Sequence, residues 1–509
     1  MIFLLHSHAE KLHNATKDGK DLSLENKTLT NAFWELVQKH PEELIIWRDK
    51  TVDLQLGDDF TTTFTHELIM ASYAVENQFI PDQIGYIDQL PFVNPNYKVV
   101  YPTWRMSTDI GGIYGKTALK FRELFKLIKN FGYLVNSIAK TGQQNGLLCY
   151  SSPHLVMNRQ SSKIEFNAGE QMLFSFVSQH YKKEWLGVLF FCLWRYENMF
   201  PLLSLMKGLN KKSWLKKNLL LPIGDIQQKY KPVEHCTIDV IIPTFFRAEH
   251  VKNLLSDLSK QSKLPNSVII VEQDPNPESK SQLDFLTEEW PFEIIHHFIH
   301  KAGACYARNL AMKSVTADYI FFADDDIRIK SDLLEKALLE INRLGVGCIN
   351  LNSLQPGEQS IFHTIKQWGA FGSGTSVVNS DYALSCRFSE IFEHGYGEDA
   401  DFGMKLREAG CDIIYHPGIV IKHLKAPVGG FRKKPVLAWE KDYPKPKPSP
   451  TVMVLAKRYY TTRQMKGFKV SLYLKYFKNQ KNKNPFTYLS DMETNWKKSE
   501  EWAERLTNK

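Results

Sequence analysis

From residue 237 onward, short apolar runs alternate with amphipathic stretches, and this alternation restricts the fold more than any other feature of the chain. Strands are predicted over residues 237–243, 267–271, 293–299 and 318–323, and helices over 250–261 and 306–315. Such a pattern is typical of an α/β domain around a mostly parallel sheet. Ligands bind sheets of this kind beyond the carboxyl ends of the strands. The polar residues that follow the strands are therefore candidate site residues: Thr244, Glu272, Asp274, Asp324, Asp325 and Asp326.

Two carboxylate clusters carry the strongest chemical signal. One is the run of three aspartates at 324–326, directly after an apolar strand, and the other is the pair Glu398 and Asp399. Carboxylates bind hard cations such as Mg²⁺ and Mn²⁺, and they also serve as general bases. Each cluster has a structural alternative, because acids are stabilised at helix N-termini. A helix is expected from Ile327 onward, and in the second cluster Asp401 alone could fill the N-terminal role.

The bulk composition is that of a folded globular protein. The chain has 509 residues, 43% of them hydrophobic and 24% charged, which is enough for two or three domains. Its seven cysteines are scattered without a CxxC pair, which favours reduced thiols and a cytoplasmic setting. Residues 1–13 have no basic region and no cleavage site, so no signal peptide is expected. The apolar stretch 185–194 is too short to span a bilayer and predicts a buried helix.

The net charge of +8 is concentrated near the end of the chain. Residues 431–509 hold 19 Lys and Arg against 7 Asp and Glu, which is 19 − 7 = +12. Aromatic residues are interspersed with these charges, at positions 459, 460, 468, 473, 476 and 477. Two interpretations remain open: a solvated helical tail that packs its aromatics on the protein, or attachment to an anionic membrane surface. Nucleic acid is not expected as a partner, because the chain contains no recognised nucleic-acid motif.

Seven motifs within residues 237–430 resemble, in the same order, those of family 2 glycosyltransferases of the GT-A fold. They are PTFFR (243–247), VEQDP (271–275), AGACYARN (302–309), FFADDDI (321–327), GSGTSVV (372–378), GYGEDADFGMKLREAG (395–410) and IYHPGIVIKH (414–423). The sixth is also similar to the C-terminal part of metazoan galactosyltransferases. The ordered set covers roughly 190 residues and is far more specific than any single motif.

The resemblance implies a nucleotide site and a metal site. Its nucleotide-contacting positions are Pro243, Thr244, Glu272 or Asp274, Arg308 beside the diphosphate, and Asp324 at the ribose or the metal. VEQDP departs from the usual paired acids, so it stays open which acid contacts the nucleotide. The implied metal ligands are Asp324, Asp326 and His423, and the implied cofactor is a divalent cation, Mn²⁺ or Mg²⁺.

The resemblance also implies that Asp399 is the general base, with Glu398 beside it. Gly372 and Gly374 either permit a close backbone approach or belong to a loop that contacts a sugar. The three histidines His296, His297 and His300 lie along an alternating strand, and they are interpreted as structural rather than as zinc ligands.

The first half of the chain contains three segments that resemble segments of the second half. Residues 43–54 resemble 318–329, residues 106–115 resemble the segment near 372, and residues 131–156 resemble 401–421. In this half Asp49 stands alone where the other half has three aspartates. The alternatives are a degenerate, non-catalytic copy of the GT-A domain or a coincidence between two α/β domains.

These segments define the expected domain map: a degenerate α/β domain over 1–222, a linker over 223–236, a catalytic GT-A domain over 237–430, and a helical basic extension over 431–509. Residues 174–220 are expected to be helical and to bridge the two domains, and 427–450 to form a loop.

The sequence therefore predicts an inverting, metal-dependent glycosyltransferase that uses a nucleotide-sugar donor and a glycan or lipid-linked acceptor. A bacterial polysaccharide-forming enzyme in the cytoplasm, peripheral at the inner membrane face, would fit these features. A non-catalytic scaffold that binds glycan or nucleotide sugar is the first alternative. A nucleotidyltransferase is the second, but PTFFRAEH lacks the glycine-rich phosphate loop that it would need. The donor sugar, nucleotide, acceptor and linkage depend on loop shape, which the sequence does not specify.

Overall fold

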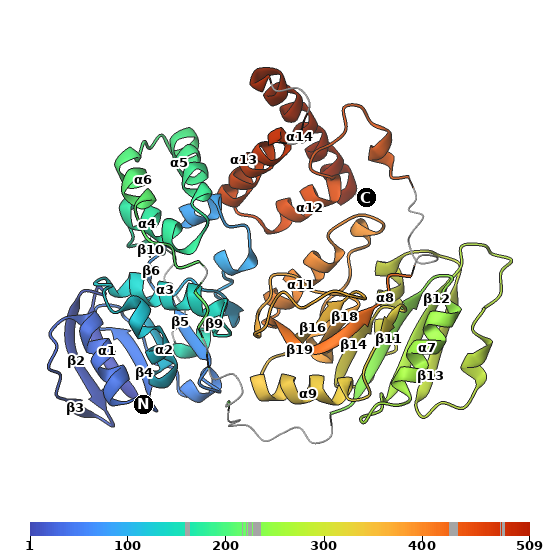
Figure 1. Ribbon diagram of the computed structural model, residues 1–509, viewed down its shortest axis with the longest axis horizontal. Coiled ribbons are helices and arrows are strands. Elements are labelled where there is room, and N and C mark those ends of the chain that lie inside the picture. Colours follow the sequence, from blue (N-terminus) through green and yellow to red (C-terminus); the bar gives the residue numbers. More distant parts are fainter. Residues whose placement is uncertain are drawn as a thin grey trace. The chain divides into compact units, whose positions relative to one another are not determined.

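The computed structural model describes residues 1–157, 163–215, 217–219, 221, 226, 236–426, 436–478, 480 and 484–508. The chain divides into two compact units, each shown as a ribbon in Figure 1. Unit 1 comprises residues 1–230 and 460–476, and unit 2 comprises residues 231–459 and 477–509. The expected linker 223–236 lies outside the described residues except for 226 and 236, as does the 427–435 part of the expected loop.

Unit 2 contains a nine-stranded mixed sheet in the order β13-β12-β11-β14-β18-β16-β19-β15, with β17 also paired to β19. β11 to β14 run parallel, whereas β18 runs antiparallel to both of its neighbours. The expectation of a mostly parallel sheet is confirmed for β11 to β14 and for the parallel pair β16 and β19, whereas the pairings of β18, β15 and β17 are antiparallel. The strands are β11 (Ile238–Thr244), β12 (Ser267–Gln273), β13 (Glu293–Ile299), β14 (Tyr319–Ala323), β15 (Ile327–Arg328), β16 (Cys348–Leu354), β17 (Lys366–Gln367), β18 (Thr375–Asn379) and β19 (Ile413–His423).

Helices α7 to α11 pack on this sheet, and α12 and α14 pack against each other near the end of the chain. They are α7 (Ala248–Leu258), α8 (Ala304–Met312), α9 (Leu333–Leu344), α10 (Ser380–Leu384), α11 (Glu398–Glu408), α12 (Pro450–Tyr459) and α14 (Pro485–Thr507). The expectation of a helix from Ile327 onward was wrong in its starting point. Ile327 is buried and pairs with His423 on β19, and Arg328 holds Asp257 through two hydrogen bonds, so this segment is extended and α9 begins at Leu333.

The core of unit 2 follows from alternation along its strands. Ile241, Ile269 and Phe322 face one side of the sheet and join a buried cluster with residues of α8, α10 and α11. Phe402 on α11 stacks on Phe388 with ring centroids 4.0 Å apart and meets the edge of Phe322. This cluster anchors the start of α11 close to the ends of the central strands.

Unit 1 contains an eight-stranded sheet in the order β3-β2-β1-β4-β8-β5-β9-β7 and a separate β10-β6 pair. Its strands are β1 (Ile2–Ser7), β2 (Lys11–Lys17), β3 (Lys20–Leu22), β4 (Leu44–Asp49), β5 (Ile69–Tyr73), β6 (Asn77–Gln78), β7 (Tyr101–Pro102), β8 (Ile110–Tyr114), β9 (Leu148–Ser151) and β10 (Glu165–Phe166). Its helices are α1 (Leu29–Lys39), α2 (Gly115–Phe125), α3 (Phe131–Gln143), α4 (Glu170–His180), α5 (Glu184–Glu197), α6 (Leu202–Leu209) and most of α13 (Thr462–Lys478).

The two sheets share their strand order and directions. The series β1-β4-β8-β5-β9 pairs parallel, antiparallel, antiparallel and parallel, and β11-β14-β18-β16-β19 pairs in the same way. An antiparallel hairpin, β2-β3, occupies the edge where unit 2 has the parallel strands β12 and β13. Two contacts also correspond: the rings Trp47–Phe131 (5.9 Å) and Phe322–Phe402 (5.8 Å), and the backbone bonds Asp49–Asp109 (2.8 Å) and Asp324–Gly374 (3.3 Å).

The stretch expected to be helical over 174–220 contains α4, α5 and α6, which span Glu170 to Leu209 and belong to unit 1. The helix expected over 185–194 is present as α5, but it is not wholly buried. Leu186, Leu189 and Leu193 face inward, while Phe191 and Trp194 are exposed, because an apolar helix at a surface can bury only one side. Among the described residues, no helix is long and apolar enough to cross a membrane.

The C-terminal segment is packed onto both units by its own buried residues. Met453 and Trp496 are among the buried side chains that α12 and α14 add to unit 2, and Gln464 is a buried residue of α13 in unit 1. The aromatic residues singled out from the sequence, at 459, 460, 468, 473, 476 and 477, are only partly exposed, and several form ring pairs, such as Tyr460 with Phe468. For these aromatics the structure matches the packing interpretation.

Candidate functional site

A hollow of about 270 Å³ lies beyond the carboxyl ends of the parallel strands of unit 2. Strand ends, the N-terminal turns of α8 and the loop after β14 all contribute to it, because neighbouring parallel strands finish at the same edge. Its lining residues are Pro243, Thr244, Phe245, Arg247, Gln273, Ala304, Arg308, Asp324, Asp325, Asp326 and His423. Seven residues singled out from the sequence are thus brought together here: Pro243, Thr244, Arg308, Asp324, Asp325, Asp326 and His423.

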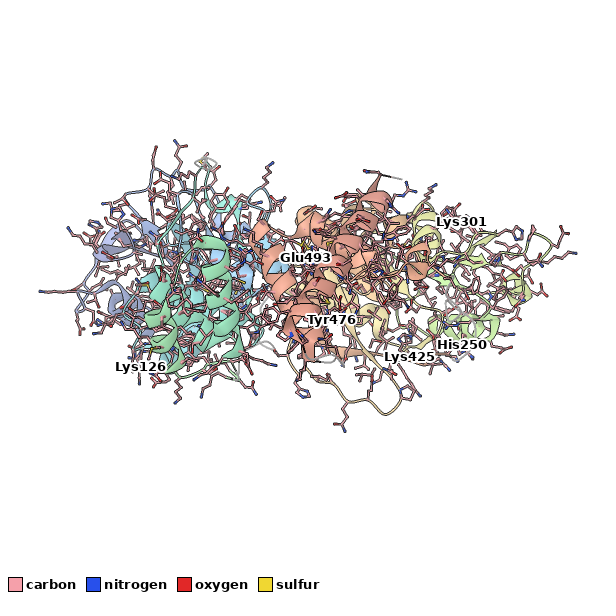
Figure 2. The ribbon with its side chains drawn as sticks, turned by 90° about the horizontal axis from the view of Figure 1, so that it is seen from above. Lys126, His250, Lys301, Lys425, Tyr476 and Glu493 are labelled. Carbon is pink, nitrogen blue, oxygen red and sulfur yellow. The ribbon has the colours of Figure 1, made fainter. Side chains whose placement is uncertain are left out.

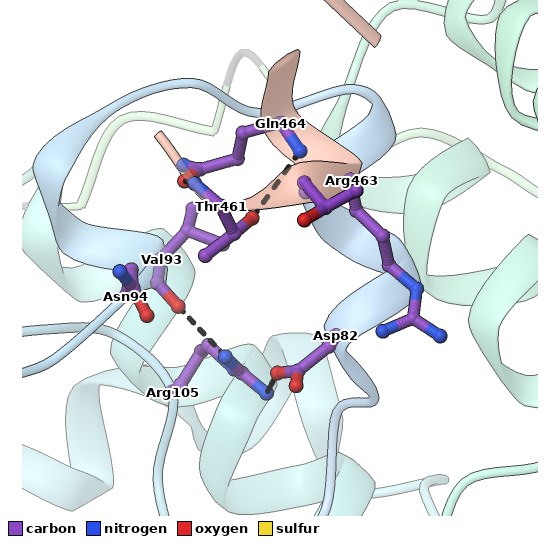
Figure 3. Close-up of a pocket in the computed structure, with 9 residues that line it drawn as sticks. Asp82, Val93, Asn94, Arg105, Thr461, Arg463 and Gln464 are labelled. Atoms are coloured by element: carbon purple, nitrogen blue, oxygen red, sulfur yellow. Dashed lines mark hydrogen bonds and ion pairs between the residues drawn. The ribbon is translucent and has the colours of Figure 1, made fainter. Parts of the chain in front are cut away.

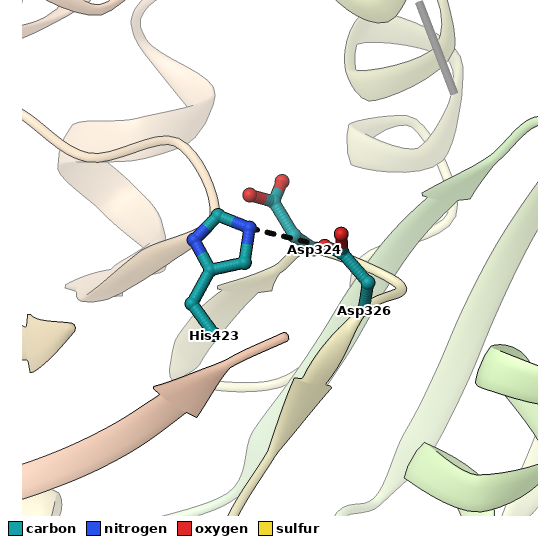
Figure 4. A group of neighbouring side chains, drawn as sticks. All are labelled: Asp324, Asp326 and His423. Carbon is teal, nitrogen blue, oxygen red and sulfur yellow. Dashed lines mark ion pairs between the residues drawn. The ribbon is translucent and has the colours of Figure 1, made fainter. Parts of the chain in front are cut away.

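Asp324, Asp326 and His423 form a cluster with the character of a metal site (Figure 4). One ligand atom from each lies within 4.8 Å of the others, and no second such group of three occurs among the residues that the structure describes. The pairing of Ile327 with His423 brings the end of β19 beside the aspartates. Two carboxylates and one imidazole are a donor set that suits Mn²⁺ or Mg²⁺.

The ion pair between Asp326 and His423 sets the charges in this cluster. His423 Nε2 lies 3.2 Å from Asp326 Oδ1, and this hydrogen bond raises the pKa of His423 against the effect of burial. Burial by itself would raise the pKa of Asp326. The bonds from His423 and from the Ala426 amide outweigh it and hold the pKa of Asp326 at about 2. Asp326 is therefore an anion at neutral pH.

The middle aspartate, Asp325, has a different environment. It is buried, accepts a hydrogen bond from Thr244 (2.8 Å), and pairs with Arg247 (2.7 Å), which also reaches Asp326 at 3.2 Å. Burial raises the pKa of Asp325 to about 6 despite the attraction of Arg247. Asp325 thus ties the ends of β11 and β14 together. No role was assigned to Arg247 from the sequence, although it closes the PTFFR motif.

Arg308 links the metal-like cluster to the second carboxylate pair. Its guanidinium is buried, donates to the Ser373 carbonyl at 3.1 Å, and contacts Asp324 at 3.2 Å. The amide of Ser373 in turn donates to Asp399 at 3.3 Å. Gly374 makes this proximity sterically possible, because a Cβ there would lie 2.1 Å from the Asp324 carboxylate carbon. The glycine-rich segment is therefore needed for a close backbone approach.

Glu398 and Asp399 open α11 beside Ser373. Burial raises the pKa of Asp399, and the nearby Arg308 charge only partly offsets this effect. Burial also raises the pKa of Glu398, with a further contribution from the Asp399 charge. A carboxylate with a raised pKa is a stronger base than an ordinary aspartate, which suits it to accept a proton.

Asp401, the structural alternative, is buried away from these groups. It pairs with Arg458 at 2.8 Å and with Lys405 at 2.7 Å, and it accepts a hydrogen bond from the hydroxyl of Tyr459 at 2.9 Å. These bonds join α11 to α12. Asp401 therefore has the structural role at the start of α11, and Asp399 is not needed for that role.

The two acids proposed from VEQDP do not line the hollow. Glu272 is buried and accepts hydrogen bonds from Ser281 and from the Gln282 amide, with His296 3.0 Å away. Asp274 caps the turn at Asn276. The intervening Gln273 lines the hollow instead.

The three histidines of β13 and its end make separate contacts, as the structural interpretation expects. His296 contacts Glu272, His297 lies 3.1 Å from the Ser314 hydroxyl, and His300 lies 3.0 Å from the Asp274 carbonyl.

The equivalent sheet edge of unit 1 is filled by the chain itself. Asp109 stands at the strand position of Gly374, and its carboxylate accepts hydrogen bonds from the amides of residues 75–77 at 2.7–2.8 Å. The Asp49 carboxylate accepts hydrogen bonds from the amides of His8 and Thr51 at 2.7 and 2.9 Å. No cation-ligating group of three is found in the described part of this unit.

Unit 1 also has a small polar hollow where the start of α13 meets residues 82–105 (Figure 3). The Arg105 guanidinium donates to the carbonyls of Val93 (2.7 Å) and Ile80 (2.6 Å) and pairs with Asp82 (3.0 Å). Arg463 pairs with Glu197 at 2.8 Å. The Arg105 bonds fix the loop of residues 80–105 and the Arg463 pair holds the start of α13, so we assign this hollow a structural role.

Residues 239–366 match the family model described as Glycosyl transferase family 2. Among curated proteins, the chain is similar to the succinoglycan biosynthesis protein ExoM of Rhizobium meliloti (strain 1021), with 25% identity over 208 residues. That match covers 36% of this chain and 66% of ExoM. It is also similar to pre-mycofactocin glycosyltransferase of Mycobacterium tuberculosis (strain H37Rv), with 26% identity over 37% of this chain and 43% of that protein. The chain thus spans less than two thirds of either relative.

Among solved structures, the chain is similar to S. aureus TarS 1–349, with 18% identity over 37% of this chain and 60% of that chain and a TM-score of 0.32. It is also similar to GalNAc-T7 crystallised with UDP, GalNAc and Mn²⁺, with 9% identity over 51% and 55% of the two chains and a TM-score of 0.37. These superpositions are too loose to support an argument about the site.

Proposed function

Because the chain carries a family 2 glycosyltransferase domain, we propose that it transfers a sugar from a nucleotide-diphosphate donor to a glycan or lipid-linked acceptor, with inversion and with a divalent cation. The observation that carries this proposal is the connected set of Asp324, Arg308, Ser373 and Asp399 at one sheet edge. It joins an anionic metal-like cluster to a base candidate across the space where a donor would lie.

In this proposal Asp324, Asp326 and His423 hold the cation, and Arg308 faces the diphosphate. A bound Mn²⁺ or Mg²⁺ would neutralise charge on the leaving diphosphate. Asp326 is suited to this role because it stays ionised, and Asp324 because it is the more exposed of the two carboxylates. Arg308 brings a guanidinium, whose planar fork of N–H donors suits phosphate oxygens.

Asp399 acts as the general base that removes the proton of the acceptor hydroxyl. Its raised pKa supports this role, as does its position at the start of α11, fixed by the Ser373 amide. A single displacement assisted by one base inverts the configuration of the transferred sugar. Glu398 adds negative charge beside it, which further favours proton uptake at this pair.

For the nucleotide, Pro243 and Thr244 form the floor of the hollow at the end of β11. Of the two candidate acids, we favour Asp274. Glu272 is committed to Ser281, Gln282 and His296, whereas the Asp274 carboxylate accepts only a local turn bond within the described residues.

Unit 1 is proposed to be a non-catalytic, degenerate copy of the same fold. The matching strand series supports a common origin, and the self-bonded Asp49 and Asp109 support the loss of a ligand site. Residues 1–222 and 237–430 then form the non-catalytic and catalytic domains, and 431–509 forms an extension.

The proposal is tested by incubating the purified chain with UDP-, GDP- and dTDP-sugars, with Mn²⁺ or with EDTA, and measuring binding and donor hydrolysis. One donor should bind in a metal-dependent way, and Asp326→Ala should weaken that binding about tenfold or more. The matched control is Asp284→Ala, which removes an exposed aspartate that does not line the hollow and should bind as the wild type does.

Two outcomes would count against the proposal. Binding that is indifferent to EDTA and to Asp326→Ala would remove the metal site. Metal-dependent binding without hydrolysis, and without transfer to any glycan or lipid-linked acceptor offered, would favour the alternative of a nucleotide-sugar-binding scaffold.

A further inference from the structure

Helices α5 and α6 of unit 1 expose an unusual number of large apolar side chains. Leu203 is 74% exposed, Phe200 64%, Met206 57% and Trp194 53%, and Phe191, Leu202 and Leu209 are exposed as well. All seven lie within residues 191–209, and none belongs to the candidate glycosyltransferase site. Contiguous apolar surface of this kind is typical of an interaction site.

These side chains lie on the outer faces of a packed hairpin. On α5, Phe191 and Trp194 are three residues apart and their rings are 6.2 Å apart, so they share one face. The rings of Phe190 and Phe200 lie 5.1 Å apart and join α5 to the start of α6. α6 packs against α4 through its other face, where Gly208 is buried. Figure 2 draws this hairpin in green with its side chains as sticks.

Positive charge surrounds this apolar face. Residues 182–217 contain eight Lys and Arg but only two acids, Glu184 and Glu197, and Glu197 is paired with Arg463. The segment after α6 helps to line a hollow of about 580 Å³ that includes four lysines and one acid, Glu123; the lysines are Lys129, Lys211, Lys212 and Lys217. These four lysines make no ion pair with any residue that the structure describes. Basic residues flanking exposed apolar ones are the pattern of an interfacial membrane contact.

We propose that the apolar face of α5 and α6, with its flanking lysines, docks on the surface of an anionic lipid bilayer. Charge complementarity favours lipid over a second copy of this chain, because two such basic faces would repel each other. The proposal differs from the earlier interpretation of the basic tail, whose aromatic side chains at 459, 460, 468, 473, 476 and 477 are only partly exposed. It also stands independently of the transfer reaction.

The first test is vesicle flotation with the full chain and vesicles of phosphatidylcholine alone or with about 30% phosphatidylglycerol. The wild type should bind the anionic vesicles, more weakly at high salt. The double variant Leu203→Gln, Met206→Gln should lose about tenfold or more in binding, because both side chains are more than half exposed and reach the acyl boundary. The matched control is Phe486→Gln, Leu489→Gln on α14, which removes two exposed apolar side chains from the tail and should bind normally.

A second readout locates the contact without relying on affinity. Brominated lipids should quench part of the tryptophan fluorescence, and Trp194→Phe should abolish that quenching while leaving binding intact. Unchanged binding of the α6 double variant would overturn the proposal, as would loss of binding in the α14 control. A dimer in light scattering that the α6 substitutions dissolve would also overturn it, in favour of a second copy as the occupant.

Discussion

Replacing Asp399 with Asn tests the assignment of the base most directly. The change keeps the size of the side chain and removes only its ability to take a proton. Its hydrogen bonds come from Ser373, from the amide at 3.3 Å and from the side chain, and the Asn oxygen can accept these as well. Loss of a general base costs about 10²–10⁴-fold in rate, which corresponds to about 3–5 kcal/mol in the barrier. Donor binding should stay near the wild-type value, since Asp399 does not line the donor hollow.

The pKa of Asp399 gives this prediction a second observable. Because burial raises that pKa, the active, deprotonated form is reached only above the usual range of an aspartate. The rate of the wild type should therefore rise with pH through this raised value, and the Asn variant should lack that limb. The folded state disfavours the ionised carboxylate, so the variant should melt no lower than the wild type at neutral pH.

The assay is donor hydrolysis, or transfer once an acceptor is known, measured from pH 4 to 9 beside a thermal melt. A variant that retains a third or more of the wild-type rate, with the same pH limb, would refute the reasoning. So would a variant that loses activity only because it unfolds.

Three further predictions concern the neighbouring structure. Asp401→Asn should lower the free energy of unfolding by about 2 kcal/mol in urea titration, because it breaks a buried pair whose partner Arg458 keeps some solvent contact. Because the folded state lowers the pKa of Asp401, its stabilising contribution is present above the unfolded-state pKa and is lost as pH falls through the folded-state pKa. Acid should therefore reduce the difference in stability from the wild type, and an equal difference at all pH values would contradict this. Gly374→Ala should weaken metal-dependent donor binding about tenfold in calorimetry, because its Cβ would collide with the Asp324 carboxylate. Gly187→Ala, where a Cβ meets nothing within 4 Å, is the control and should bind as the wild type does. Wild-type affinity in Gly374→Ala would show that the loop adapts to the added methyl group. Phe402→Ala should destabilise the chain by about 3–5 kcal/mol in urea titration, since its fully buried ring stacks on its neighbours, and a loss below about 1 kcal/mol would argue against this packing.

Much of the architecture could be predicted from local patterns. The four apolar runs of the second half became β11, β12, β13 and β14 with nearly the expected bounds, because short β-rich runs bounded by turns have few other ways to bury their side chains. The similarity between the two halves was also visible in sequence, since buried strands and a helix that begins near an FG pair leave recognisable apolar patterns.

Other features depended on contacts distant in sequence. The extended segment at Ile327 could not be distinguished from a helix start, because its partner strand ends almost a hundred residues later. The exposed side of α5 was likewise hidden, since an apolar helix has the same sequence whether one face or both are covered.

The sequence by itself determined which chemistry this chain can offer: adjacent aspartates after an apolar strand, an acidic pair at the start of a helix, and a motif order that resembles that of family 2 glycosyltransferases. Only the tertiary structure decided which of these acids form structural ion pairs and which belong to the candidate site. Asp325 pairs with Arg247 and Asp401 with Arg458, while Asp324 and Asp326 belong to the candidate metal cluster and Asp399 lies at the Ser373 amide. The physical reason is that a carboxylate's role follows from its burial and its charged neighbours, and Arg458 and Arg247 come from segments 57 and 78 residues away.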